Sequence, residues 1–360
     1  RHMRLSSLRF GVGAMAAASV NCARPIIAVV ASGDNHPALA RLPASLSESV
    51  ELVRVGETPA EIEAQANELG RCTGLLWIPT AGSPSAPSDT LVAVWPKLSQ
   101  VTWVHSFAAG VDGLGGFIQA SLLPAQDRVV LTNGRGAFSS SLAEYALAGM
   151  LYFNKQIPRC QQQREARTWH NFVMDTMHDK TVGLVGYGSI GQATGRAVKG
   201  AFGSRVLALR RQVNGENEGP ADQVFGFDDR MEFFSQCDFV VCSLPSTPTT
   251  QKFIGAAELA AMKPTSVLIS VGRGAAVDEA ALAASLQSGG LKGAVLDVFA
   301  TEPLPEASPL WGMENVLMTS HNADFTEDYF ELGWKVWGEN LECFEKGAPL
   351  ATPVDLREGY

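Results

Sequence analysis

The segment Thr181-Val-Gly-Leu-Val-Gly-Tyr-Gly-Ser-Ile-Gly191 places an apolar run directly before the pattern G-x-G-x-x-G. The pattern alone is weak, because 35 of the 360 residues are glycine. Its position is informative: the apolar run predicts a β-strand at Thr181–Val185, and the following residues predict a helix. Such glycines permit a tight turn and let a pyrophosphate approach the helix N-terminus. The segment therefore predicts a dinucleotide-binding unit, with a simple strand-to-helix turn as the alternative.

Further strand candidates follow this motif, with helical segments between them. They are Val206–Leu209, Phe239–Cys242, Ser266–Val271, Gly293–Val298 and Val316–Thr319. With Thr181–Val185 they make six, which suits a doubly wound parallel sheet. A smaller unit precedes them, with strand candidates at Ile26–Ala31, Val50–Val55, Gly74–Ile78 and Val101–His105. The pattern predicts an α/β protein of two domains.

The predicted helices differ in length and character. Two short ones, Pro59–Leu69 and Asp89–Trp95, lie in the first unit, on either side of a Pro/Ser-rich loop at Thr80–Asp89. A long helix from Ser139 to Arg167 is expected between the units, since apolar residues recur there at close to helical spacing. The last, about Thr326 to Lys346, is rich in aromatic residues and needs a surface to pack on. We expect that surface to be the first domain.

Composition narrows the possible functions. The formal net charge is −9 and no run of Lys and Arg offsets it, so nucleic acid is not an expected partner. No stretch reaches the roughly 20 apolar residues that a membrane helix needs. The six cysteines include no C-x-x-C pair, which argues against a zinc site and a disulfide framework. We expect a soluble protein with reduced thiols and no metal.

The first 24 residues contain four arginines and no acidic residue. This composition fits either a disordered leader behind a cloning remnant, with Met3 as the natural start, or an organelle transit peptide. We exclude residues 1–24 from the fold and predict a cytoplasmic protein. A mitochondrial or plastid location is the alternative, if residues 3–24 form a transit peptide.

The residues after the second strand of the dinucleotide unit indicate which cofactor binds. An acidic residue at that place would accept hydrogen bonds from the ribose hydroxyls of NAD, but the chain has Arg210 and Arg211. Two guanidinium groups can pair with a 2′-phosphate. We therefore predict NADP(H) as the preferred cofactor and NAD(H) as possible, the alternative being that these arginines are simply solvated.

Five stretches together resemble the D-isomer-specific 2-hydroxyacid dehydrogenases, a family that includes glyoxylate/hydroxypyruvate reductases, D-lactate dehydrogenases and phosphoglycerate dehydrogenases. They are His105–Asp112, Thr132–Arg135 with Ala143–Tyr145, the glycine motif, Met262–Gly274 with Val277–Glu279, and Leu296–Phe299 with Glu302–Leu304. The resemblance covers about residues 25 to 360. It implies a flavodoxin-like substrate domain, residues 25–130 and 322–360, and an inserted Rossmann-like NAD(P)-binding domain, residues 131–321. It also implies a homodimer formed mainly by the cofactor domain.

Reduction of a 2-keto acid requires a hydride on the carbonyl carbon, a proton on its oxygen and a cation for the carboxylate. His321 suits the proton donor, and a neighbouring Glu302 would raise its pKa and orient the ring. Arg273 can hold the carboxylate and polarise the keto oxygen. The resemblance assigns these positions the same roles, and Glu302 argues against formate oxidation, since formate dehydrogenases of the family carry Gln there. Taken singly, each residue could instead have a purely structural role.

Other contacts are implied by the resemblance. The amides of Ala109 and Gly110 would bind the substrate carboxylate, and Phe107 and Trp77 are candidates for the pocket wall, with core packing as the alternative. Asp297 would accept a hydrogen bond from the nicotinamide carboxamide. His105 is expected to be structural. The cofactor contacts that we predict are Tyr187, Gly188, Ser189, Ile190, Arg210, Arg211, Leu244, Pro245, Thr249, Val271, Gly272 and Asp297.

The residues after His321 depart from the family's usual small apolar run. They read Asn322-Ala-Asp-Phe-Thr326 and bring an amide, a charge and a ring close to the histidine. We predict NAD(P)H-dependent reduction of a small 2-keto acid, of the glyoxylate/hydroxypyruvate type, to the D-2-hydroxy acid. The alternatives are an NAD-dependent D-lactate or phosphoglycerate dehydrogenase and a non-catalytic cofactor sensor, because the C-terminal-binding-protein corepressors share this architecture.

Overall fold

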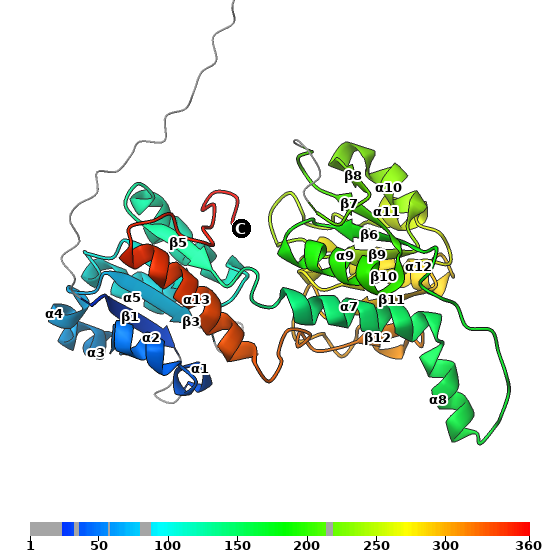
Figure 1. Ribbon diagram of the computed structural model, residues 1–360, viewed down its shortest axis with the longest axis horizontal. Helices are drawn as coiled ribbons and strands as arrows, with labels where there is room; N and C mark the ends of the chain where they lie inside the picture. The colour runs from blue at the N-terminus through cyan, green and yellow to red at the C-terminus, as the bar shows by residue number, and fades with distance from the viewer. Residues whose placement is uncertain (1–23, 32–35, 57, 80–87, 214–218) are drawn as a thin grey trace, which may run out of the picture.

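A computed structural model describes the chain except for residues 1–23, 32–35, 57, 80–87 and 214–218. The described strands form two separate parallel sheets, one of five strands and one of seven. Each sheet belongs to its own lobe, and the lobes stand side by side (Figure 1). The predicted α/β class with two domains is confirmed.

The substrate domain contains the five-stranded sheet, in the order β2-β1-β3-β4-β5. Its strands are β1 (Ile26–Ala31), β2 (Glu51–Arg54), β3 (Gly74–Ile78), β4 (Trp103–Ser106) and β5 (Val130–Asn133). Its helices are α1 (Pro37–Ala40), α2 (Ala44–Ser49), α3 (Pro59–Ala64), α4 (Ala66–Leu69), α5 (Ser88–Val94), α6 (Gly115–Phe117) and α13 (Tyr329–Glu345). Local sequence sets the start of α3, where the N-cap Thr58 and Glu61 of the first turn form a capping box and Pro59 is the first helical residue.

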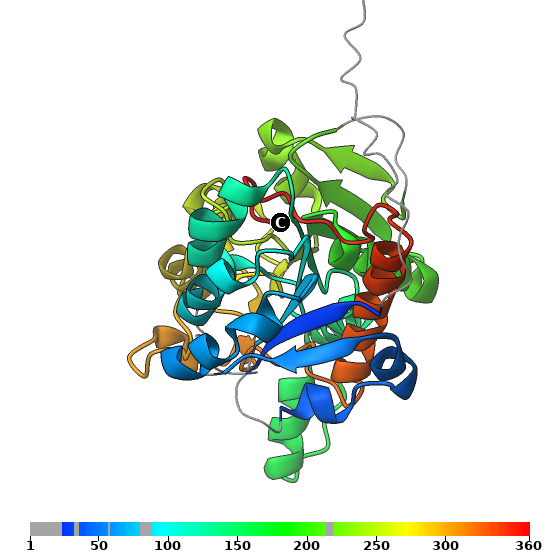
Figure 2. The ribbon, with the colours of Figure 1, turned by 90° about the vertical axis from the view of Figure 1, so that its left-hand side faces the viewer.

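Helix α13 returns from the far end of the chain and completes the substrate domain. Figure 2 shows it running beside the first strands. Trp334 and Trp337 are fully buried. The ring of Trp334 contacts Phe107, which directly follows β4, and that of Trp337 contacts Trp103 of β4. The indole N–H of Trp334 donates to the carbonyl of Ala38 at 2.8 Å. The aromatic face of this helix therefore packs on the first domain, as expected.

The cofactor domain contains the seven-stranded sheet, in the order β12-β11-β10-β9-β6-β7-β8. Its strands are β6 (Thr181–Val185), β7 (Arg205–Leu209), β8 (Gln223–Phe225), β9 (Phe239–Cys242), β10 (Val267–Ser270), β11 (Gly293–Leu296) and β12 (Val316–Met318). Its helices are α7 (Ser139–Asn154), α8 (Ile157–Glu165), α9 (Ser189–Phe202), α10 (Arg230–Gln236), α11 (Ala256–Ala261) and α12 (Glu279–Gln287).

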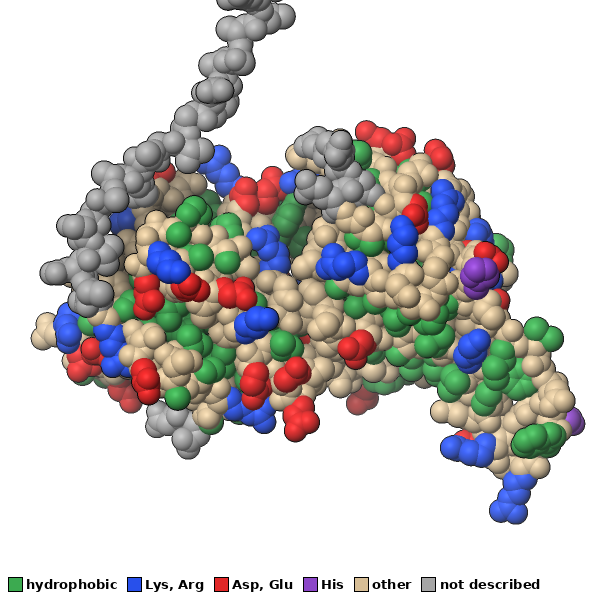
Figure 3. All heavy atoms as spheres, viewed as in Figure 1, with side chains coloured by type: hydrophobic (Ala, Val, Ile, Leu, Met, Phe, Trp, Pro, Cys, Tyr) green, Lys and Arg blue, Asp and Glu red, His purple; other side chains and the backbone are tan. Residues whose placement is uncertain are grey.

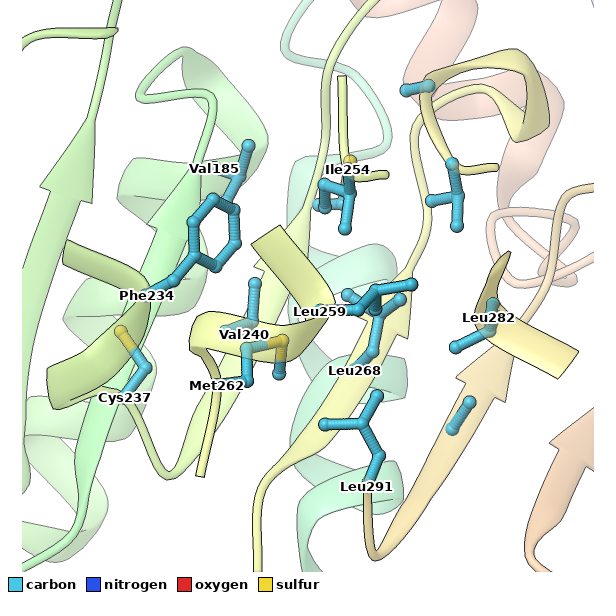
Figure 4. Packing of buried hydrophobic residues seen from close by; sticks show 14 of the residues in the cluster. Val185, Phe234, Cys237, Val240, Ile254, Leu259, Met262, Leu268, Leu282 and Leu291 are labelled. Carbon is cyan, nitrogen blue, oxygen red and sulfur yellow. The ribbon is translucent and has the colours of Figure 1, made fainter. Parts of the chain in front are cut away.

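The strand order reverses at β6, because the chain first proceeds outward to β7 and β8 and then crosses to β9, on the other side of β6. In open α/β sheets, ligands bind at the carboxyl ends of the strands next to such a reversal. Side chains from α10, α11 and α12 pack on one face of this sheet, and Figure 4 shows part of that cluster, with Phe234, Leu259 and Leu282 against Val240 and Leu268. This core fixes the strand ends that carry the site.

The structure corrects three details of the sequence prediction. The boundary at residue 130 falls at the start of β5, which pairs with β4 and belongs to the substrate domain. The long helix is two helices, because Gln156 adopts a left-handed conformation (φ 50°) and Pro158 interrupts the helical hydrogen bonds. The cofactor sheet gains a seventh strand, β8, which has only three residues and lies at the edge.

The expectations for the leader, the Pro/Ser-rich loop, the cysteines and membrane helices can be compared only with the described residues. All but the last residue of the predicted leader, residues 1–24, and most of the Thr80–Asp89 loop lie outside the described residues. Of the cysteines in the described part of the chain, all five are free thiols and three are buried. Among the described helices, none has the length and apolarity that crossing a membrane requires.

We predict that Trp334→Ala destabilises the protein by about 3–5 kcal/mol, because it removes a fully buried aromatic ring and leaves a cavity. The free energy of unfolding is measured by urea denaturation. Trp311→Ala is the matched control, since Trp311 is 56% exposed, and it should cost less than about 1 kcal/mol. Equal effects of the two substitutions would show that α13 does not stabilise the substrate domain.

Candidate active site

The predicted site residues lie at the carboxyl ends of parallel strands. Arg210 follows β7, Leu244 follows β9, Gly272 and Arg273 follow β10, and Asp297 follows β11. His321 comes shortly after β12. From the other sheet, Ala109 and Gly110 follow β4. Since strands of one parallel sheet end along a common edge, residues distant in the sequence are brought together there.

His321 and Glu302 form the central pair. The Nδ1 atom of His321 lies 2.7 Å from Oε2 of Glu302, and Oε1 of Glu302 accepts the backbone N–H of Phe299 at 2.8 Å. The hydrogen bond to Glu302 raises the pKa of His321 more than burial lowers it. Burial alone would raise the pKa of Glu302, but the hydrogen bonds from His321 and Phe299 outweigh it and lower that pKa. The pair favours a protonated imidazole beside an ionised carboxylate.

Asp297 holds the loop that carries His321. Its carboxylate is almost completely buried and accepts the hydroxyl of Thr319 at 2.6 Å and the N–H groups of Asn322 and Ala323 at 3.0 and 3.2 Å. Its backbone carbonyl accepts the N–H of His321 at 2.8 Å. In this structure Asp297 therefore positions the loop with His321.

Arg273 reaches across to the substrate domain. Its Nε donates to Oδ1 of Asp112 at 2.9 Å, and its Nη1 donates to the carbonyl of Gly272 at 2.9 Å. Its Nη2 lies so close to Gly110 that a Cβ at this glycine would be 1.6 Å away. Only glycine permits this approach. The positive charge of Arg273 also acts on His321 and Glu302, since it lowers the pKa of both.

The backbone beside Arg273 offers hydrogen-bond donors. The carbonyl of Ala109 accepts the side-chain amide of Asn133 at 2.6 Å, which fixes this turn. The N–H groups of Ala109 and Gly110 donate to no acceptor among the residues that the structure describes. Two such donors beside a guanidinium group make a suitable place for a carboxylate.

The glycine motif has the geometry that a dinucleotide requires. Gly186 adopts φ +94°, and a Cβ at Gly191 would lie 2.2 Å from the carbonyl oxygen of Gly186. A Cβ at Gly188, the N-cap of α9, would meet nothing within 4 Å, so space is open at the N-terminus of this 14-residue helix. Ser189 and Ile190 form its first turn. The residues present therefore fit a pyrophosphate at this end of α9.

The other predicted cofactor contacts come after strands of the same sheet. Gly272 packs tightly against the segment after β9, where a Cβ would lie 2.5 Å from the carbonyl oxygen of Leu244. Arg210 and Arg211 are exposed at the end of β7. Leu244 and Pro245 follow β9, Val271 and Gly272 follow β10, and Asp297 follows β11, whereas Thr249 lies seven residues beyond the end of β9. Their contact with a cofactor stays a prediction.

Three aromatic side chains lie in the protein interior instead of lining the site. Tyr187 is 8% exposed and its hydroxyl accepts the N–H of Ala221, so only its backbone faces the helix end. Phe107 is 1% exposed and packs on α13, which does not support its ring as a pocket wall. Trp77 is likewise buried in the core. These rings fill the space between sheet and helices because burial stabilises large apolar side chains.

His105 is fully buried, and its Nδ1 lies 2.8 Å from the hydroxyl of Thr132. Burial lowers its pKa to about 3, so the ring stays neutral. Its neutral, buried state agrees with the predicted structural role.

The unusual segment after His321, residues 322–326, brings polar and charged side chains close to that histidine. Asn322 is exposed, and its side-chain oxygen accepts the N–H of Ser320. Burial raises the pKa of Asp324, and the charges of His321 and Arg273 act on this carboxyl in the opposite direction. Asp324 therefore lies within electrostatic reach of His321 and Arg273.

Sequence reasoning missed two contributors. Asp112 closes the stretch His105–Asp112, but its contact with Arg273 joins two domains and has no local signature. Tyr145, whose hydroxyl lies 2.6 Å from that of Thr319, continues the hydrogen-bonded chain from Asp297 into α7. The Ala143–Tyr145 stretch carries part of the family resemblance, but no pattern in it indicates this role.

Residues 147–323 match the family model described as "D-isomer specific 2-hydroxyacid dehydrogenase, NAD binding domain". A glyoxylate reductase from Thermococcus gammatolerans is 33% identical over 230 residues, which is 63% of this chain and 67% of the relative. The chain belongs to the D-isomer-specific 2-hydroxyacid dehydrogenase family. The predicted family and the predicted oxidoreductase class are thereby confirmed. Members of this family use NAD(P).

Solved structures of this dehydrogenase family have the same two-domain fold. A D-isomer-specific 2-hydroxyacid dehydrogenase from Xanthobacter autotrophicus, in complex with NADPH and MES, is 26% identical with a TM-score of 0.76, covering 94% of this chain and 100% of that one. An NADPH-dependent glyoxylate/hydroxypyruvate reductase from Sinorhizobium meliloti, in complex with NADP and malonate, is 27% identical with a TM-score of 0.68, covering 94% and 98%.

The His321–Glu302 pair predicts a pH dependence. Because the pKa of His321 is raised above its ordinary 6.5, the protonated ring stabilises the fold below about pH 6.5, and this contribution is lost as the pH rises through the raised value. Glu302→Gln removes the carboxylate that raises the pKa of His321, whereas the burial that lowers this pKa remains. The pKa of His321 should therefore fall to or below 6.5. Imidazole NMR titration measures it.

The control for this substitution is Glu306→Gln, which changes an exposed carboxyl on the same loop. It should leave the titration of His321 unchanged. A pKa of His321 that stays high in Glu302→Gln would mean that another group sets it.

Proposed function

We propose that this protein reduces a small 2-keto acid of the glyoxylate/hydroxypyruvate type to the D-2-hydroxy acid, with NADPH as its preferred reductant. The observation that carries the proposal is the Glu302–His321 pair with the charge of Arg273 acting on both. This arrangement supplies a proton donor and an anion-binding cation at one place, which is what the reduction of a 2-keto acid requires.

The substrate carboxylate is held where the two domains meet. Arg273 and the N–H groups of Ala109 and Gly110 supply the donors. Because Asp112 occupies Nε of Arg273, the Nη2 side of the guanidinium remains for the substrate. The same positive charge stabilises the negative charge that develops on the keto oxygen. A small acid suits this site, since Gly110 and Arg273 are in close contact.

The proton comes from His321. Its Nδ1 is engaged by Glu302, so Nε2 is the atom that gives a proton to the keto oxygen. Glu302 stabilises the imidazolium before transfer and orients the neutral ring afterwards. The bound nicotinamide supplies the hydride that the carbonyl carbon receives. Asp297 keeps the loop with His321 in place through Thr319, Asn322 and Ala323.

NADPH is proposed over NADH because Arg210 and Arg211 stand at the end of β7, where an acidic residue would otherwise bind the ribose hydroxyls. Their guanidinium groups are exposed, so they are accessible to a 2′-phosphate. The two NADP(H)-bound family structures, at 26% and 27% identity, support this preference.

We further infer a homodimer that uses the arm formed by α8 and the segment up to residue 178. The arm projects from the cofactor domain (Figure 1), and apolar side chains are visible on it in Figure 3. Trp169 is 92% exposed, Val173 89% and Met174 43%. Large apolar side chains gathered in this way mark a contact surface. A second copy is the partner that the resemblance implies.

The first test of the proposed reaction is a panel of 2-keto acids assayed with NADPH and with NADH. Glyoxylate and hydroxypyruvate should be the best substrates and NADPH the better reductant. His321→Ala should reduce kcat at least about 100-fold, because it removes the proton donor. His178→Ala, at an exposed histidine, is the control and should retain activity.

Two outcomes would overturn the proposal. Unchanged turnover in His321→Ala would show that His321 is not the proton donor. Tight cofactor binding without turnover on any acid of the panel would favour the cofactor sensor.

The arm is tested by the double substitution Trp169→Ser and Val173→Ser. Light scattering after size exclusion should show a dimer for the unmodified protein and a monomer, or a dimer at least about 10-fold weaker, for the variant. Trp311→Ser changes an exposed tryptophan outside the arm and should leave the dimer intact. A monomeric unmodified protein would refute the dimer, and a variant as tightly dimeric as the unmodified protein would place the interface elsewhere.

A further inference from the structure

The C-terminal tail, residues 351–360, is attached to the substrate domain. The hydroxyl of Thr352 donates to the carbonyl of Asn133 at 2.6 Å, and the N–H of Val354 donates to the carbonyl of Leu131 at 2.9 Å. Val354 is buried in the core of that domain. These contacts extend the edge of the sheet beyond β5, so the start of the tail is fixed.

The end of the tail forms a compact turn. The carboxylate of Asp355 accepts the N–H groups of Arg357 and Glu358 at 2.9 and 3.1 Å. The N–H of Asp355 donates to the carbonyl of Tyr360 at 3.1 Å. Figure 1 shows this end of the chain at the boundary between the lobes. The turn holds Glu358 in one place.

Glu358 contacts the cofactor domain at Arg211. Its carboxylate forms an ion pair with Nη1 of Arg211, and the guanidinium carbon lies 5.8 Å from the centre of the Tyr360 ring. The hydrogen bond to Glu358 is the main cause that raises the pKa of Arg211. The side chains of Arg211 and Glu358 remain 41% and 45% exposed. The pair is therefore open to solvent and exchangeable.

We infer that Glu358 competes with the 2′-phosphate of NADP(H) for Arg211 and thereby limits how strongly the protein prefers NADPH to NADH. The inference rests on the proposed role of Arg210 and Arg211 in cofactor binding. A guanidinium that already pairs with a carboxylate attracts a phosphate less, and the two anions repel each other when both are near. Arg210 makes no side-chain ion pair among the described residues, so the competition concerns Arg211 alone.

The contact also connects cofactor choice to the two domains. The tail belongs to the substrate domain, whereas Arg211 belongs to the cofactor domain. A 2′-phosphate that takes Arg211 releases the tail from the cofactor domain. NADH has an uncharged 2′-hydroxyl at this position, so the tail contact persists when NADH binds.

The experiment compares Glu358→Gln with the unmodified protein by calorimetric titration at low salt. The probes are 2′,5′-ADP and 5′-AMP, which differ by the 2′-phosphate. Glu358→Gln should bind 2′,5′-ADP about two- to fivefold more tightly, the size expected for an exposed ion pair, with no change for 5′-AMP. Glu342→Gln is the matched control, because it removes the same charge from another exposed ion pair of the substrate domain.

Arginine variants separate this inference from the proposed cofactor preference. Arg210→Ala and Arg211→Ala should each weaken 2′,5′-ADP binding, and in Arg211→Ala the further change Glu358→Gln should have little effect. If neither arginine variant weakens 2′,5′-ADP, the proposed cofactor site is wrong. If both do but Glu358→Gln leaves the 2′,5′-ADP affinity unchanged or weaker, the competition is refuted and Glu358 does not oppose the phosphate.

Discussion

The buried carboxylate of Asp297 is the contact on which the arrangement of the site depends. A buried carboxylate is costly unless hydrogen bonds satisfy it, and here three donors from the segment after β12 do so. Its backbone carbonyl also accepts the N–H of His321. His321 adopts φ +51°, a left-handed conformation that persists only where the surroundings fix it. The loop is therefore shaped by one residue, Asp297, which directly follows the neighbouring strand β11.

Two arginines of the cofactor domain pair with carboxylates of the substrate domain. Arg273 contacts Asp112 beside the His321–Glu302 pair, and Arg211 contacts Glu358 at the end of β7. Basic and acidic side chains border the notch between the lobes on the face drawn in Figure 3. In a protein of net charge −9, these carboxylates counter the positive charge that anionic ligands require.

Hydrophobic periodicity and short motifs predicted most of the fold. Buried parallel strands appear in the sequence as apolar runs, so the bounds of most strands were predicted to within one or two residues. The glycine motif located the dinucleotide unit. The pairing of His321 with Glu302 was also predicted, because a histidine that donates a proton needs a neighbouring carboxylate to raise its pKa and orient its ring. The local pattern could not reveal short edge strands such as the three-residue β8. Nor could it reveal the helix break at Gln156, where a single residue in the left-handed conformation separates α7 from α8.

Contacts between distant residues were beyond prediction from one sequence. The partners Asp112 and Arg273 are 161 residues apart, and Arg211 and Glu358 are 147 apart. Phe107 was predicted at the pocket wall, but its ring packs on α13, which comes from the other end of the chain. The ring of Tyr187 is buried as well, and its hydroxyl accepts the N–H of Ala221.

The chain passes between the two domains twice, once from β5 to α7 and once from β12 to α13. The two passages meet, because the ring of Phe138 at the start of α7 stacks on that of Tyr329 at the start of α13, with centroids 4.3 Å apart. The stacked rings therefore join the two interdomain segments at one point. Together with the ion pairs Arg273–Asp112 and Arg211–Glu358, this contact holds the two domains in their relative placement.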